Sequence, residues 1–377
     1  MKKTTTTLML GIILFSACVK NDLKKDISVN EQLSGPPPTT CSYPAVNVYT
    51  HAGAGYSGYI DGDVLLAQFR YPEAIARFGS NLYVGDDKFI RRITGTTVST
   101  LVTLGSSEKV ECLAVDLSGN IYAAVGEVFS FATAIKKFSP AGTLLATYGS
   151  LTEYGHRDGS PARFTMISGI AVDAAGIIYV AQMEDYSIRM IDLDGNASLI
   201  AGGLGGSLPG YGFADGPVAT AKFGFIQGVA VSPAGDKIYV ADDHAVRMIT
   251  EGYVYTIAGG SAKGIVDGDG SSARFFELSG IALDGAGNLY VTDNRFLNNY
   301  PPASYIRKVI KMTSGLVAWK VTTLAGNSYG FANGVGAAAK FYRPSEIVID
   351  NSATTAYIAD AGNYRIRKMT LACGITF

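Results

Sequence analysis

The stretch Asp158-Gly-Ser-Pro-Ala-Arg-Phe-Thr-Met-Ile-Ser-Gly-Ile-Ala-Val-Asp173 contains the pattern that decides the fold. An Asp-Gly pair is followed by an Ala-x-Phe step and then by a short apolar run. The same pattern opens four further segments, which begin at Asp61, Asp215, Asp267 and Asn333. Repetition of this kind indicates an array of similar units, so the 377 residues do not divide into two or three unrelated domains.

Each unit continues with further short apolar stretches that are separated by turn residues. The second stretch carries a tyrosine in all six units, namely Tyr83, Tyr122, Tyr179, Tyr239, Tyr290 and Tyr357. Short apolar stretches bounded by turns predict β-strands, four to a unit. We therefore predict an all-β, six-bladed β-propeller, since one small sheet buries both faces only when neighbouring sheets pack against it. A parallel β-helix, which has shorter repeats, is the structural alternative.

The repeat resembles a known family, the NHL repeat. The segments that carry the resemblance are Gly169-Ile-Ala-Val-Asp173, Tyr239-Val-Ala-Asp242, Thr322-Thr-Leu-Ala-Gly326 and Asn363-Tyr-Arg-Ile-Arg-Lys368. The resemblance covers residues from about 46 to 370. NHL-like domains are commonly six-bladed propellers, so the resemblance implies the blade count that the tyrosines give.

The two ends of the repeat region predict a closed ring. The last unit stops after its third strand, Arg365 to Met369, and an orphan strand of the missing type lies at Val46 to Gly53. This strand would complete blade six and remove an open sheet edge. Because Cys41 precedes the orphan strand and Cys373 follows the third strand, we also predict a disulfide between them. The propeller domain is thus predicted to span residues 45–377.

The first residues indicate export and lipid anchoring. Lys2 and Lys3 precede a short apolar run that ends in Phe15-Ser16-Ala17-Cys18. This end resembles the lipobox of bacterial lipoproteins, in which the cysteine is lipidated after cleavage. We therefore expect a signal peptide at 1–17, lipidation of Cys18, and a polar tether at 18–44. The protein would then be anchored in the bacterial cell envelope, in the periplasm or on the outer-membrane surface. An ordinary cleaved signal is the alternative.

Composition and charge exclude several function classes. Gly and Tyr number 45 and 22, and only 17% of residues are charged, which is typical of strands joined by tight turns. Removal of Lys2 and Lys3 with the signal peptide would change the formal charge from −1 to −3. This balance argues against nucleic-acid binding. The chain has no G-x-S-x-G motif, and His51, His156 and His244 lack metal-ligand spacing.

An internal repeat distinguishes scaffold residues from candidate functional residues. The recurring aspartates after the second strands and the recurring Arg or Lys of the third strands are expected to form ion pairs that fix each blade. The Asp-Gly loops are expected to be turns with a packed short helical segment. Asp267-Gly-Asp-Gly270 lacks the later Glu of a calcium loop. Functional residues should therefore be sought where the repeat is broken.

Two such departures are predicted to meet on the loop-rich face. Long loops in blades two and five carry Phe129, Phe131, Phe296 and Tyr300, whose rings could stack on a sugar. The alternative is that these rings pack between blades.

Glutamates form the second departure. Glu73 and Glu346 are aligned with glycines Gly169, Gly228 and Gly280 of other blades, and Glu111 lies one place earlier. Such carboxylates could hold Ca²⁺ or a cationic group, or one could act as a base; pairing with Arg70, Arg77 or Arg343 is the alternative.

These features together predict a monomeric binding module for a protein or a glycan rather than an enzyme. We expect no resident cofactor, with Ca²⁺ as the one candidate. The enzymatic alternative is a metal-dependent hydrolase similar to gluconolactonases, whose metal is held by acidic and amide side chains in the channel. Only the glutamates resemble part of that ligand set.

Overall fold

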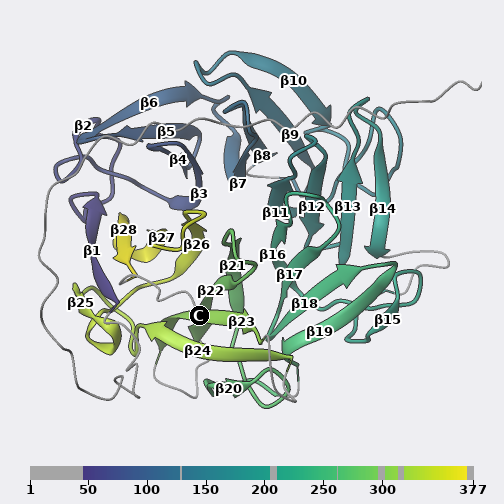
Figure 1. The fold of residues 1–377 in the computed structure, drawn as a ribbon. Coiled ribbons are helices and arrows are strands. Elements are labelled where there is room, and N and C mark those ends of the chain that lie inside the picture. Colours follow the sequence, from purple (N-terminus) through teal and green to yellow (C-terminus); the bar gives the residue numbers. More distant parts are fainter. Residues whose placement is uncertain are drawn as a thin grey trace, which may run out of the picture. The chain divides into compact units, whose positions relative to one another are not determined.

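The computed structural model describes residues 46–127, 130–203, 210–260, 262–295, 302–312 and 318–371. These residues form six antiparallel sheets arranged as a ring around a central channel (Figure 1). The innermost strand of each sheet contacts the innermost strands of both neighbouring sheets, and that of blade six contacts that of blade one. The predicted six-bladed propeller is therefore confirmed. No helix in the described part of the chain is long and apolar enough to span a bilayer.

In each of blades one to three, the four main strands run from the channel outward in the order of the chain. Blade one contains β3 (Pro72–Phe78), β4 (Asn81–Asp86), β5 (Phe89–Thr94) and β6 (Thr97–Thr103). Blade two contains β7 (Glu108–Val115), β8 (Ile121–Glu127), β9 (Thr133–Phe138) and β10 (Leu144–Gly149). Blade three contains β11 (Ile167–Val172), β12 (Ile178–Gln182), β13 (Ser187–Ile191) and β14 (Ala197–Gly202).

Blades four to six repeat this order. Blade four contains β16 (Ile226–Val231), β17 (Ile238–Asp242), β18 (Ala245–Thr250) and β19 (Tyr253–Gly259). Blade five contains β21 (Leu278–Leu283), β22 (Leu289–Arg295), β23 (Ala303–Lys311) and β24 (Trp319–Ala325). Blade six contains β26 (Pro344–Ile349), β27 (Thr355–Asp360), β28 (Arg365–Thr370) and β1 (Asn47–Ala52).

The N-terminal strand closes the ring as the sequence predicts. Strand β1 pairs antiparallel with β28, with Asn47 opposite Thr370 and Tyr49 opposite Lys368. The first and last parts of the domain thus share one sheet, which leaves no open edge at the chain ends. Cys18, Cys41 and Cys373 lie outside the described residues, so lipidation and the disulfide stay predictions.

The Asp-Gly segments differ from their predicted form. In four blades they add a short fifth strand to the outer edge of the sheet, and these strands are β2 (Gly62–Asp63), β15 (Gly216–Pro217), β20 (Gly268–Asp269) and β25 (Gly334–Val335). The expected helical segment follows in blade six alone, as the 3-10 turn η1 (Gly336–Ala338). A second 3-10 turn, η2 (Ala361–Asn363), precedes β28. Edge pairing prevails because it satisfies backbone groups on the outermost strands.

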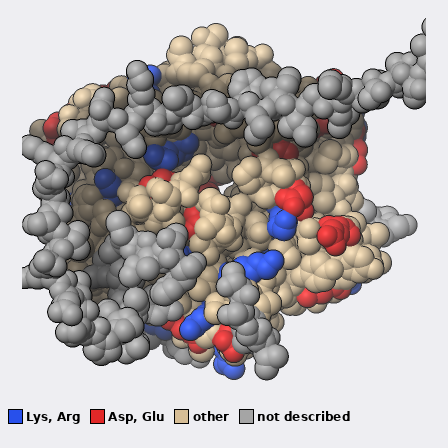
Figure 2. All heavy atoms as spheres, in the orientation of Figure 1, with Lys and Arg blue, Asp and Glu red and all other residues tan. Residues whose placement is uncertain are grey.

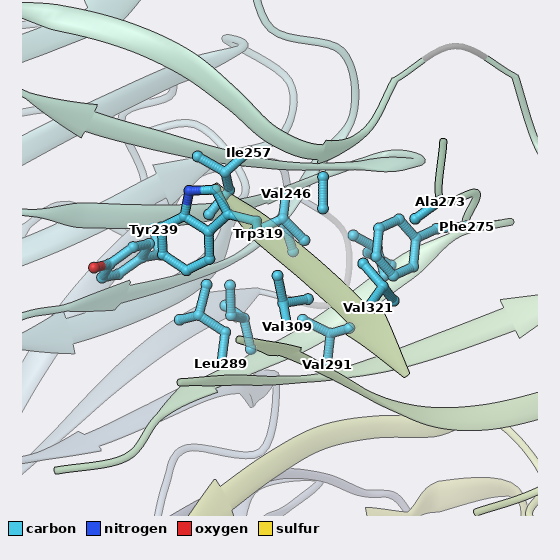
Figure 3. Packing of buried hydrophobic residues seen from close by; sticks show 14 of the residues in the cluster. Tyr239, Val246, Ile257, Ala273, Phe275, Leu289, Val291, Val309, Trp319 and Val321 are labelled. Atoms are coloured by element: carbon cyan, nitrogen blue, oxygen red, sulfur yellow. The ribbon is translucent and has the colours of Figure 1, made fainter. Parts of the chain in front are cut away.

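The core lies between the blades. Alternate residues of each strand point to the two faces of its sheet, so neighbouring sheets interlock through apolar side chains. Between blades four and five, Tyr239 and Val246 face Val291, Val309 and the chain's single Trp (Figure 3). The rings of Tyr239 and Trp319 meet edge to face, with centroids 6.4 Å apart.

A buried arginine ties together the strands of most blades. In blade five, Arg307 on β23 pairs with Asp293 at 2.9 Å and with Asp267 of the Asp-Gly segment at 2.7 Å. Its guanidinium also lies over the ring of Phe275, the aromatic residue of the Ala-x-Phe step. The buried arginines Arg91 and Arg247 pair with two aspartates in the same way. Arg189 and Arg367 each pair with one aspartate, and an amide side chain, Gln182 or Asn333, takes the place of the other. The predicted scaffold role of the recurring Asp and Arg residues is confirmed.

Arg307→Gln is expected to destabilise the fold by about 3 kcal/mol or more, because it leaves the buried Asp293 carboxylate without its cation. Urea unfolding of the variant and the parent protein measures the difference. The control is Arg274→Gln, which changes an exposed arginine of the same blade and should shift stability by less than about 0.5 kcal/mol. Equal stability of both variants would contradict the role given to Arg307.

Candidate binding site at the channel mouth

A register shift at the start of every innermost strand sets the geometry of the site. In blade one, Pro72 lies opposite Asp86 but Ala74 lies opposite Gly85, so Glu73 is an extra, bulged residue. Shifts at the equivalent place occur in all six blades. Such a bulge re-aims its side chain. The bulged residues are Glu73, Glu111, Ser168, Gln227, Ser279 and Ser345.

These six side chains line one cavity of about 580 Å³ at the end of the channel, which we call the mouth cavity. Figure 2 shows the molecule hollowed at the centre of the ring, with acidic and basic side chains beside the opening. Further lining residues are Met166, Glu277, Asn294, Tyr342, Arg343 and Glu346. The cavity volume is within the range of small-ligand sites, and its lining combines charged, polar and apolar side chains.

The register corrects one alignment made from the sequence. Glu346 occupies the position that is glycine in blades three to five, because it pairs with Ala359 as Gly169 pairs with Ala181. Glu73 does not occupy this position; Ala74 does. Glu73 and Glu111 are instead equivalent to each other. Comparison of the six units could not reveal the bulge, because the bulge adds one residue to the strand and has no sequence motif of its own. All three glutamates nevertheless line the mouth cavity.

The cation beside Glu73 and Glu111 is Lys109, which the sequence analysis did not consider. Its Nζ lies 2.7 Å from Glu73 Oε2 and 3.3 Å from Glu111 Oε2. Burial disfavours the charged ammonium, but attraction by Glu111 and Glu73 outweighs it and raises the pKa of Lys109. Burial raises the pKa of Glu111, although Lys109 opposes the shift. The i, i+2 spacing of Lys109 and Glu111 was the available signal, since such residues share a strand face.

Glu346 lines both the mouth cavity and a second cavity of the channel, and among the described residues no cation pairs with it. Burial raises the pKa of its carboxyl to about 8, despite a hydrogen bond from the Ile347 amide at 3.3 Å. The neighbouring blade makes room for it, because a Cβ at Gly280 would lie 2.9 Å from Glu346 Oε1. At neutral pH this carboxyl is therefore mostly protonated and can donate a hydrogen bond.

Two of the bulged serines join neighbouring blades. Ser168 Oγ donates to the Ile226 carbonyl and Ser345 Oγ donates to the Glu73 carbonyl, each at 2.7 Å. In blade five, Ser279 Oγ accepts a bond from Asn294 Nδ2 at 3.0 Å. These bonds hold the ring of bulges in place, so the mouth cavity has a fixed outline.

The predicted aromatic residues are placed only in part. Phe129, Phe296 and Tyr300 lie outside the described residues. Phe131 is 60% exposed and its ring contacts that of Tyr154 at 6.2 Å. It is therefore accessible rather than packed between blades.

A second aromatic group, which the sequence analysis missed, includes a residue that closely precedes the bulge of blade four. The rings of Tyr186, Tyr211 and Phe225 contact one another with centroids 5.1 to 5.9 Å apart. Tyr211 and Phe225 are exposed, and Phe225 lies two residues before the bulged Gln227. The recurring Tyr-Gly-Phe of Tyr211 to Phe213 and Tyr329 to Phe331 was the signal that could have found it.

The described residues contain no group of three or more His, Cys, Asp or Glu side chains arranged to hold a metal ion. His156 instead pairs with Asp185 and His244 with Asp243, in different blades. Lys109 already bridges two of the three glutamates.

Fold and cavity together define a β-propeller with NHL-type blades and a polar mouth. Residues 155–370 match the Teneurin NHL domain family, and the chain belongs to that family. Teneurin-3 of Danio rerio is 28% identical over 343 residues, which cover 83% of this chain and 12% of that protein. The chain thus spans a small part of the length of this curated relative.

Solved structures share the fold. A protein of unknown function from Bacteroides thetaiotaomicron has a TM-score of 0.64 and 22% identity, with 87% of this chain and 76% of that chain covered. An auxiliary nutrient binding protein from Bacteroides ovatus has a TM-score of 0.62 and 18% identity, with 87% and 77% covered. At these identities the similarity concerns architecture.

The buried Glu346 carboxyl makes stability depend on pH. Its folded pKa of about 8 lies above the ordinary value of 4.5, so its contribution to stability is complete below pH 4.5 and is lost as pH rises through 8. Glu346→Gln removes this loss. Relative to the parent, the variant should gain on the order of 2–4 kcal/mol between pH 5 and pH 9, since one pKa unit is worth about 1.4 kcal/mol.

Urea unfolding at the two pH values measures this gain. Glu153→Gln, which alters an exposed glutamate paired with Arg163, is the matched control and should follow the parent protein. An identical pH dependence for Glu346→Gln and the parent would show that the Glu346 carboxyl is ionised in the folded state.

Proposed function

We propose that this chain is a lipid-anchored binding module of the bacterial cell envelope that takes a glycan into its mouth cavity. The observation that carries the proposal is the cavity itself, in which a ring of carboxyl, amide and hydroxyl side chains adjoins exposed aromatic rings. The protein would act as a monomer, through a rigid scaffold, without a cofactor or nucleic acid.

The lining suits the two kinds of surface that a sugar presents. Sugar hydroxyls donate to carboxylate and amide oxygens, which Glu277 and Gln227 offer, and they accept bonds from a protonated carboxyl such as Glu346. The C–H faces of a sugar ring pack on flat aromatic side chains, which Tyr342 of the lining and the exposed Phe225, two residues before Gln227, would supply. The cavity volume of about 580 Å³ leaves room for more than one sugar ring.

A binding role is also consistent with one protein of the same fold. The Bacteroides ovatus protein is described as an auxiliary nutrient binding protein, and we extend a binding role to this chain by analogy of fold. The Teneurin relationship gives the family of the domain, and we draw no ligand from it.

Phe225→Ala should weaken glycan binding about ten-fold or more, because loss of a stacking aromatic surface costs on the order of 1–2 kcal/mol. The purified full chain in detergent is first screened on a glycan array, and the strongest ligand is then titrated by calorimetry. Tyr255→Ala is the matched control, since Tyr255 is similarly exposed but lies on β19, the fourth strand of blade four counted from the channel. An array without any bound glycan would refute the glycan proposal and favour a protein ligand.

Cys18→Ser should move the protein from the detergent phase to the aqueous phase in a Triton X-114 partition of whole cells, because the acyl chains on Cys18 provide the membrane affinity. Cys41→Ser removes a cysteine without touching the anchor and should stay in the detergent phase. Metabolic labelling with a fatty acid checks the modification directly. A Cys18→Ser variant that still partitions with detergent would contradict anchoring at this residue.

A further inference from the structure

Two cations occupy equivalent positions at the mouth cavity. Lys109 directly precedes Val110, and Arg343 directly precedes Pro344; Val110 and Pro344 are the last paired residues before the bulges of blades two and six. Both cations therefore hold the same register position, next to the bulge of their own blade. The repeat thus allows a direct comparison of two sites within one molecule.

The surroundings of the two cations differ in one respect. Lys109 is bridged to Glu73 of the preceding blade and Glu111 of its own. At Arg343 the corresponding bulged residues are Ser279 and Ser345, which carry no charge. Within the described part of the chain, no side chain forms a hydrogen bond or ion pair with the Arg343 guanidinium. Arg343 therefore lacks the carboxylate partners that its counterpart has.

The backbone at Arg343 is an independent sign of function. Its φ of 53° lies in the left-handed region, which bulky residues rarely adopt. Among the cavity-lining residues that the structure describes, Arg343 is the only non-glycine residue with such a φ. Unfavourable backbone conformations of this kind gather at ligand sites.

We propose that the mouth cavity binds an acidic saccharide whose carboxylate pairs with Arg343. This inference rests on the proposed function and names the ligand class within it. The planar guanidinium matches a carboxylate through two parallel N–H bonds, and the ligand carboxylate takes the place that the glutamates hold beside Lys109. Gln227 and Glu277, which line the same cavity and have no side-chain partner in the described residues, bind the sugar hydroxyls. Tyr342 supplies the adjoining aromatic face.

The charge of the remaining lining permits this pairing. The Lys109 ammonium offsets much of the charge of Glu73 and Glu111, and the Glu346 carboxyl is mostly protonated at neutral pH. A sugar places hydroxyl groups as well as its carboxylate around the cavity, so its hydroxyl groups can meet Glu277 while the carboxylate lies at Arg343. A neutral saccharide would leave the guanidinium without an anionic partner.

Calorimetric titration of the full chain with trigalacturonate and with its methyl ester tests the proposal. The parent protein should bind the acid at least ten-fold more tightly than the ester. Arg343→Gln should remove this preference, and Arg274→Gln, which alters an exposed arginine outside the cavity, should retain it. Ser279→Glu should also weaken binding of the acid, because it supplies the internal carboxylate that blade one gives to Lys109. Ser279→Gln, of the same size without charge, should weaken it less.

Equal affinity for acid and ester, or an unchanged preference in Arg343→Gln, would overturn the role of Arg343 while saccharide binding itself stands. Binding of neutral glycans on the array with no response to trigalacturonate would do the same. Absence of binding to every glycan would refute the proposed function together with this inference.

Discussion

The architecture depends on a buried arginine that connects the strands of a blade. Arg247 illustrates the arrangement: it pairs with Asp242 at the end of the second strand and with Asp215 of the Asp-Gly segment. Its Nη atoms also donate to the carbonyl groups of Ala214 and Lys222. Asp215 in turn accepts a bond from the Thr256 amide of the fourth strand. One guanidinium thereby fixes the second, third and fourth strands and the loop that enters the blade.

Burial of so much charge needs an explanation, because the desolvation of an ion pair can cancel its attraction. We infer that the gain is mainly in specificity. A shift of one residue in strand pairing would turn every apolar side chain of the strand to the wrong face of the sheet. The planar arginine guanidinium can meet its partners in one register only, and it therefore selects against such a shift. Blade two supports this view. It lacks the Asp-Gly segment, and its third strand carries Lys136, whose one ion-pair partner among the described residues is Glu108 at 2.7 Å. Where the aspartate of the Asp-Gly segment is absent, a lysine ammonium replaces the arginine guanidinium.

The fold could be predicted because its determinants repeat. Asp-Gly, Ala-x-Phe and the third-strand arginine recur in the same order, and each repetition supports the same prediction. The position of the N-terminal strand around Val48 was equally predictable, because blade six is the one blade whose fourth strand is missing from the end of the chain. The site was harder to predict because it arises from a bulge. A bulge changes which residue faces the channel without changing the apolar pattern, so Glu73 was aligned one position away from its true place. Lys109 was missed because its partner Glu73 comes from another blade.

The bulge also explains how one scaffold can carry a specific site. Arginine clusters lie at the third strands, whereas the bulged residues lie on the innermost strands, so changes at the mouth leave the buried ion pairs intact. Six positions share one backbone geometry and differ only in side chain, which makes the cavity chemically asymmetric inside a nearly symmetric ring. Two bulged glutamates pair with Lys109 on one side of the cavity. On the other side the bulged residues near Arg343 are serines, which offer it no carboxylate. Because Ser345 and Ser168 are hydrogen-bonded to the neighbouring blades, this asymmetry is set before a ligand arrives, and little ordering remains to oppose binding.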